Sequence, residues 1–278
     1  MYSLRKINAV CLFQLRQAFS AWKNPGIFLL VGIFIWLNVQ QVGDFSKIVD
    51  VAVHPWLFAH LTNDFICQLV FAAACVAIFC DAPWSTRLNE YILVRSGKLA
   101  QSAGHIQYIV VLSLVFTLFI FAISVLALLP VAEFADGWGK VLGTLARTNA
   151  GMQIGMSFTV NDYLIGAYTP LRAIVLSLLL EWALFTWIGL CIYLCNKYIG
   201  KMSGIFAAVA FVLLDITVAN EFSLAAYRFS PLTLAQLSAF HGMNAQFGVT
   251  LRYAACFFVC GISVMAVTIL VLSRRRER

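Results

Sequence analysis

Three carboxylates lie inside long apolar runs of this sequence: Asp64, Glu181 and Asp215. An ionisable group in the hydrocarbon of a bilayer costs at least about 2.5–3.5 kcal/mol at mid-span, so it normally faces a partner or a wet cavity. One interpretation is an anionic lining along the path of a cationic or amphipathic substrate, such as a peptide. The other is structural, with carboxylates that are protonated or bonded to neighbouring helices. Both stay open, and Glu181 is the deepest of the three candidates.

The cysteines and histidines do not form a catalytic or metal-binding pattern. Cys191/Cys195 and Cys256/Cys260 are spaced four apart, which stacks each pair on one helix face. A metal site would need histidine or carboxylate partners in reach, so we interpret these cysteines as small buried hydrophobes. The sequence also lacks HExxH and GxxxxGK[ST]. We therefore expect no enzyme activity, no metal site and no cofactor bound by this chain.

Composition indicates the class of protein that holds these residues. Of 278 residues, 62% are hydrophobic and 11% are charged, whereas soluble domains average about 25% charged. The net charge of +7 comes from Lys and Arg in short segments beside apolar runs, not from one basic face, which argues against nucleic-acid binding. The chain is expected to be an all-α integral membrane protein.

Apolar runs of about 20 residues are long enough to cross a bilayer as helices. Six are found, and together they form a single transmembrane domain over residues 1–278. They lie at about 25–42, 56–80, 104–129, 170–194, 203–220 and 250–272.

Orientation follows from the Lys and Arg residues, most of which fall on one side of these six spans. That side holds the N-terminal segment, the loop at 81–103, the loop between spans four and five, and the C-terminal tail. Positive charge is retained in the cytoplasm, so both termini and the loop at 81–103 are expected to be cytoplasmic.

Three further segments are too short or too broken to span. Residues 2–23 are expected to form an amphipathic helix on the cytoplasmic surface, because their apolar residues recur at helical spacing. The outer loop at 131–169 contains a short amphipathic helix around Trp138–Leu145. Residues 221–249 predict a re-entrant hairpin or short outer helices, since irregular backbone at membrane depth must be buried in protein.

The loop at 81–103 mixes charges of both signs with aromatic residues. An amphipathic segment of this kind is either a docking surface for another protein or a solvated connection between spans. The candidate contact residues are Trp84, Arg87, Glu90, Tyr91, Arg95 and Lys98.

Several short motifs favour docking. The stretch DAPW, then EYILVRSGK, then GHIQYI resembles a region common in ABC-2 type permeases of Gram-positive bacteria. WGKVLGTLA in the outer loop, YTPLRA entering span four and FSPLTLAQL after span five are similar to the same group. The order of elements also resembles that family, with an elbow helix, six spans and broken helices before the last span.

The resemblance implies a function and partners. The loop at 81–103 would be a coupling helix gripped by a separate cytoplasmic ATPase, which binds the ATP. The chain would pair with a second copy of itself or with a homologous permease, in the cytoplasmic membrane of a bacterial cell. We expect an ATP-driven exporter that moves a peptide, antibiotic or other amphipathic substrate. The alternative is a non-transporting immunity or sensor protein that binds a peptide antibiotic.

Overall fold

The computed structural model describes the whole chain except residues 1, 84–95, 201, 220–227, 241–248 and 276–278. Within the described residues every regular element is a helix, and the only β pairing is an isolated bridge between Val53 and Ala132. In this described part of the chain, four helices are long and apolar enough to cross a membrane: α2 (Lys23–Val49), α6 (Lys98–Leu126), α10 (Pro170–Tyr198) and α14 (Leu251–Arg275). The expected class, an all-α multi-pass membrane protein, agrees with this architecture.

Two of the six expected spans are shorter than the other four. Helix α4 (Phe65–Phe79) has 15 residues and α11 (Ser203–Ala219) has 17. At a rise of 1.5 Å per residue, 15 residues cover only about 22 Å, less than the roughly 30 Å of a hydrocarbon core. Four helices of the described residues are therefore long enough to span a membrane, and six spans are not confirmed.

The prediction of one continuous helix over 56–80 is wrong, because the chain breaks at Asp64. A short helix, α3 (Phe58–Leu61), precedes the break and α4 follows it. Asp64 has extended backbone angles (φ −82°, ψ 132°), and its carboxylate accepts hydrogen bonds from the amides of Ile66 and Cys67. A side chain that caps the first turn in this way starts a new helix, so Asp64 separates the two.

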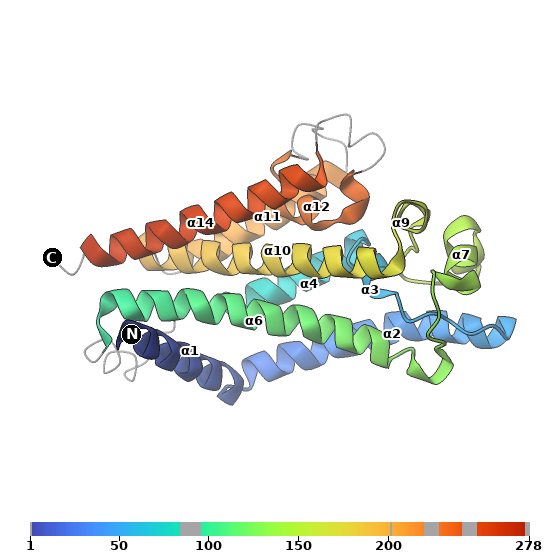
Figure 1. Ribbon diagram of the computed structural model, residues 1–278, viewed down its shortest axis with the longest axis horizontal. Coiled ribbons are helices and arrows are strands. Elements are labelled where there is room, and N and C mark those ends of the chain that lie inside the picture. The colour runs from blue at the N-terminus through green and yellow to red at the C-terminus, as the bar shows by residue number, and fades with distance from the viewer. Residues whose placement is uncertain (1, 84–95, 201, 220–227, 241–248, 276–278) are drawn as a thin grey trace.

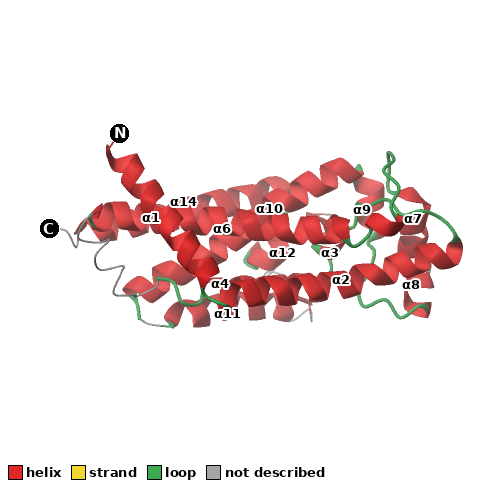
Figure 2. Cartoon of the chain, turned by 90° about the horizontal axis from the view of Figure 1, so that it is seen from below, coloured by secondary structure: helices red, strands yellow, loops and turns green. Residues whose placement is uncertain are grey.

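Helix α1 (Tyr2–Ser20) crosses the start of α6 (Figure 2). The contact is close: a Cβ atom on Gly104 of α6 would lie 2.6 Å from Val10. The buried residues of α1 include Val10, Cys11 and Ala18, whereas Leu4 is exposed. Not every apolar residue of this helix therefore packs against the bundle.

Helix α10 is the centre of the bundle. In its most apolar stretch 67% of the residues are buried, against 11% for α14. It packs against α4, α6, α11 and α14. Both chain termini lie at the same end of the bundle, where α6 begins and α10 ends (Figure 1).

The opposite end of the bundle carries short helices: α7 (Gly139–Arg147), α8 (Ala150–Gln153) and α9 (Asp162–Ala167). The short 3₁₀ helix η1 (Leu129–Val131) leads into this region from α6. Trp138, just before α7, donates from Nε1 to the carbonyl of Tyr168 at 2.8 Å. This hydrogen bond links the start of α7 to the residues that precede α10.

Between α11 and α14 the structure describes α12 (Pro231–Ala235) and the 3₁₀ helix η3 (Leu237–Phe240), which fall within the range 221–249. All five residues of α12 are buried. Ser230 begins α12 by accepting a hydrogen bond from the amide of Thr233. Protein therefore surrounds this irregular backbone, as the bilayer requires.

Candidate functional site

Most of the expected docking segment lies outside the described residues, including Trp84, Arg87, Glu90, Tyr91 and Arg95. Lys98, the remaining candidate, is the first residue of α6 and not a loop residue. Helix α6 therefore begins six residues before the expected start of span three at 104. Gly97, at φ 83°, holds the left-handed conformation that lets the chain turn directly into this helix.

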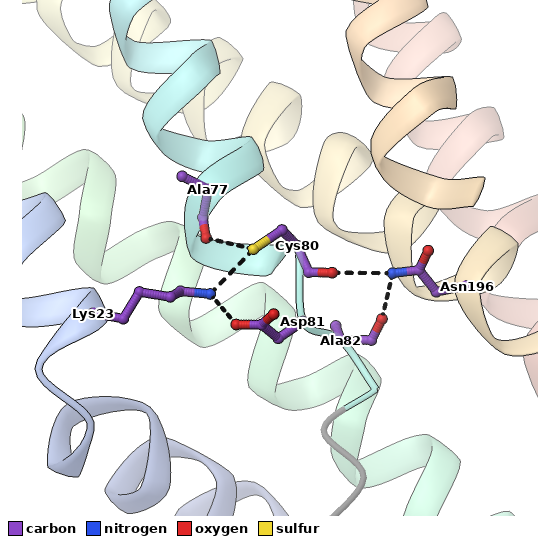
Figure 3. A network of polar contacts seen from close by, with 6 residues as sticks. All are labelled: Lys23, Ala77, Cys80, Asp81, Ala82 and Asn196. Carbon is purple, nitrogen blue, oxygen red and sulfur yellow. Dashed lines mark hydrogen bonds and ion pairs between the residues drawn. The ribbon is translucent and has the colours of Figure 1, made fainter. Parts of the chain in front are cut away.

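The entry to the segment is attached to two other helices, α2 and α10. Asp81, two residues beyond the end of α4, forms an ion pair with Lys23 at the start of α2. Lys23 also donates to the sulfur of Cys80 at 3.2 Å. Asn196 of α10 donates from Nδ2 to the carbonyls of Cys80 (3.2 Å) and Ala82 (2.7 Å) (Figure 3).

Asn196 also joins this group to α11, because its Oδ1 accepts from the amide of Gly204 at 2.8 Å. The two helices are very close there. A Cβ atom on Gly204 would lie 2.4 Å from the carbonyl oxygen of Ile192. One amide side chain thus satisfies three backbone groups on α11 and at the end of α4.

The exit from the segment is attached through the next residue of α10. Lys197 donates from Nζ to Ser102 Oγ on α6 (2.7 Å), to Tyr193 OH (2.9 Å) and to Ser273 Oγ on α14 (3.2 Å). Ser102 and Ser273 are themselves 2.7 Å apart. Tyr198 completes the group by donating to the carbonyl of Ile269 at 3.0 Å.

We call these two adjacent residues, Asn196 and Lys197, the α10 clamp. They hold both ends of the connection between α4 and α6 to the central helix. Sequence analysis used the positive charges between spans four and five only to assign orientation, and it singled out neither Asn196 nor Lys197. The available signal was the polar pair Asn-Lys at the end of an apolar run of more than twenty residues.

The first intramembrane carboxylate, Asp64, is saturated by donors. One oxygen accepts from the amides of Ile66 and Cys67, both at 3.1 Å. The other accepts from the amide and the hydroxyl of Thr159, at 3.2 and 3.4 Å. Asp64 therefore starts α4 and ties it to the connection that follows α8.

Asp215 on α11 is buried and holds α12 in place. Its Oδ1 accepts from the hydroxyl of Ser230 at 3.2 Å and from the hydroxyl of Thr233. Its Oδ2 has no partner among the described residues. The contacts fix the irregular segment against α11 at the site where the backbone leaves helical geometry.

Glu181 on α10 is 1% exposed and sits in the core opposite Gln68 of α4, which is 0% exposed. Gln68 lies close enough to act on the carboxylate as a side-chain hydrogen-bond donor. Even so, none of the four polar side-chain atoms of this pair has a formed hydrogen bond to any described residue. Sequence analysis missed Gln68, although an amide in the apolar stretch FICQLVF was a visible signal.

The three carboxylates each have their own set of neighbours, on different helices. In the described part of the chain, no group of three or more His, Cys, Asp or Glu residues could hold a metal ion. The polar contacts that join the largest number of helices are those of the α10 clamp. The clamp, together with the segment it holds, is the candidate site for contact with a partner.

No family model, curated protein or solved structure matches this chain. Composition and fold define the class: over the residues that the structure describes, the chain is all-α and has four helices that could cross a membrane.

Proposed function

We propose that this chain is the permease subunit of an ATP-driven exporter of the ABC-2 type. A separate cytoplasmic ATPase would contact residues 81–103, and two permease chains would form the path for an amphipathic substrate such as a peptide or antibiotic. The motif resemblance supports the family. The observation that carries the proposal is the α10 clamp, because it connects both ends of the docking segment to the central helix.

A displacement of the segment would reach most of the bundle through these contacts. At the entry, a displacement would reach α2 through the ion pair between Asp81 and Lys23. It would also reach α10 through the hydrogen bonds from Asn196 to the carbonyls of Cys80 and Ala82. At the exit, Ser102 acts on α10 and α14 through Lys197. A partner that moves this segment as nucleotide binds would therefore move α2, α10 and α14 together.

The proposed orientation places the clamp end of the bundle, with both termini, in the cytoplasm. The clustering of Lys and Arg in the N-terminal segment and in the tail supports this. The bacterial cytoplasmic membrane is the location implied by the family resemblance.

The test uses the full-length chain, co-expressed with a candidate cytoplasmic P-loop ATPase and reconstituted in lipid vesicles. The double variant Tyr91→Ala/Arg95→Glu should lose the co-purifying ATPase and the stimulation of ATP hydrolysis. Arg147→Ala is the matched control, since Arg147 is exposed and pairs with Asp162 at the other end of the bundle. Undiminished binding and hydrolysis in the double variant would overturn the proposal.

One observation favours the alternative, a non-transporting immunity or sensor protein. A cavity of about 270 Å³ opens at the end of the bundle opposite the clamp, lined by residues that include Met152, Met156 and Phe158. It would accommodate a single large side chain of a peptide. Nucleotide-dependent movement of a peptide into vesicles would identify the exporter, and peptide binding without movement would identify the sensor.

A further inference from the structure

Glu181 and Gln68 are two polar residues buried in the interior of the bundle. Glu181 lies in the middle of α10, and Gln68 lies in the first turn of α4. Both side chains are more than nine-tenths buried, at 1% and 0% exposure. The oxygens and nitrogen of both side chains have no hydrogen-bond partner among the described residues. Buried polar atoms are normally paired, so this group of four requires an explanation.

An ionised Glu181 would be poorly compensated. No Lys or Arg of the described residues bonds to it. The two cations of α10 are engaged at its ends: Arg172 lies over the Tyr168 ring, and Lys197 belongs to the clamp. A buried charge without a partner is strongly unfavourable, because desolvation is not repaid by attraction or hydrogen bonding.

The other titratable groups of the helices around α10 supply no positive charge either. Cys75 on α4 lies near the carboxylate, and its thiol donates to the carbonyl of Phe185. His60 on α3 accepts the amide of Asn161 at Nδ1, which requires the neutral ring. None of the other titratable residues on α10 and its neighbouring helices forms a hydrogen bond or ion pair with Glu181 in the described structure, including the cations Lys98, Arg252, Arg274 and Arg275.

The numbers of hydrogen-bond donors and acceptors decide whether the ionised or the neutral form of Glu181 suits the side chain of Gln68. An ionised carboxylate only accepts, so Gln68 could donate to it, but the amide oxygen of Gln68 would stay unpaired. A neutral acid has one O–H donor and one carbonyl acceptor, and a primary amide has the complementary set. A reciprocal pair would engage all four atoms at once. One proton is the only addition needed.

We propose that Glu181 is a proton-binding site: the neutral acid donates to the amide oxygen of Gln68 and accepts from its amide nitrogen, and this pair joins α4 to α10. The site holds one proton per chain while the two helices are packed. Separation of α4 from α10 would admit water, release the proton and expose a carboxylate in the bundle. Gln68 lies near the start of α4 and Asp81 lies two residues beyond its end, so motion of the docking segment would reach this pair through the length of α4. The protonated pair itself does not depend on the proposed transport function.

Infrared spectroscopy of the full-length chain in lipid vesicles at neutral pH tests the proposal. The wild-type spectrum should contain the carbonyl stretch of a protonated carboxylic acid, and Glu181→Gln should remove it. Asp215→Asn is the control, because it changes a carboxylate with hydroxyl partners and should leave that band in place. If the difference between wild type and Glu181→Gln shows the stretches of an ionised carboxylate instead, the proposal is overturned.

A swap of the two residues provides a second test. In Gln68→Glu/Glu181→Gln the acid and the amide exchange helices, and the reciprocal pair can form again. We expect this double variant to recover both the acid band and the wild-type melting temperature. We expect Gln68→Leu to melt several degrees lower, because the acid loses its partner. A swap that melts as low as Gln68→Leu, or that shows an ionised carboxylate, would contradict the pair.

Discussion

Asn196 and Lys197 are neighbours in the last turns of α10, yet they hold opposite ends of one connection. Asn196 binds the carbonyls at the end of α4, and Lys197 binds a hydroxyl near the start of α6. Successive residues of a helix point about 100° apart, so a single turn can reach two different neighbours. This geometry makes the central helix sensitive to any displacement of residues 81–103.

Replacing Asn196 should destabilise the protein more than its partial burial suggests. Asn196→Ala leaves the carbonyls of Cys80 and Ala82 and the amide of Gly204 without their side-chain partner. An unsatisfied buried polar group costs about 1–3 kcal/mol, so the melting temperature of the purified chain should fall clearly. Gln41→Ala is the control, because Gln41 makes its hydrogen bonds to Ser157 in an exposed position. Equal melting temperatures for the two variants would argue against a structural role of the clamp.

The ion pair between Lys23 and Asp81 should matter little for stability and more for coupling. Its side chains are 35% and 56% exposed, and exposed pairs contribute about 0–1 kcal/mol. Asp81→Asn should therefore melt close to the wild type but lower the ATPase stimulation by the reconstituted permease. Lys47→Met, which removes an exposed pair with Asp44 on α2, is the control for charge loss. A large fall in melting temperature for Asp81→Asn would show that the pair is structural.

Gly204 should not tolerate a side chain. The Cβ atom of alanine would lie 2.4 Å from a backbone oxygen of α10, which cannot move away as a flexible side chain could. Gly204→Ala should therefore force α10 and α11 apart at a cost of roughly 1–3 kcal/mol. Gly143→Ala in α7 is the matched control, since nothing lies within 4 Å of its added Cβ atom. Thermal unfolding compares the two, and equal midpoints would contradict the close helix contact.

Asp64 should act as a helix cap, for which its charge is not required. Asp64→Asn keeps an oxygen that can accept from the amides of Ile66 and Cys67, and asparagine is about as good a cap as aspartate, although its amide nitrogen cannot accept from Thr159. Asp64→Ala removes the cap and should cost about 0.5–2 kcal/mol. Thermal unfolding measures the difference, and transport by the reconstituted exporter measures function. If Asp64→Asn folds as the wild type but abolishes transport, the charge belongs to the substrate path instead.

Labelling with a membrane-impermeant maleimide should place the two ends of the bundle on opposite sides of the membrane. A cysteine at Met152, which is 79% exposed near α7, should react in intact cells. A cysteine at Gly97 should react only after the cells are opened. Labelling of the wild type measures the background from the eight native cysteines. Burial raises the pKa of the Cys11 thiol, which slows the reaction of this cysteine with the maleimide. Reaction at Gly97 in intact cells would overturn the proposed topology and the docking site with it.

Composition and apolar run length determined the class of this protein and the positions of its long helices. A bilayer accepts only segments whose backbone is internally bonded and whose surface is apolar, so helices such as α6 and α10 are visible in the sequence itself. The chain breaks at Asp64 because a polar side chain there replaces the missing helical partners of two amides, an effect that mean hydropathy does not register.

Only the tertiary structure decided which polar residues meet. Asn196 lies 114 positions from Ala82, and Lys197 lies 95 from Ser102. Gln68 and Glu181 likewise face each other across two helices that are far apart in the chain. Such pairings depend on the order, rotation and relative height of packed helices. A local pattern of residues carries the length and the apolar face of each helix, but not the neighbour against which that face will pack.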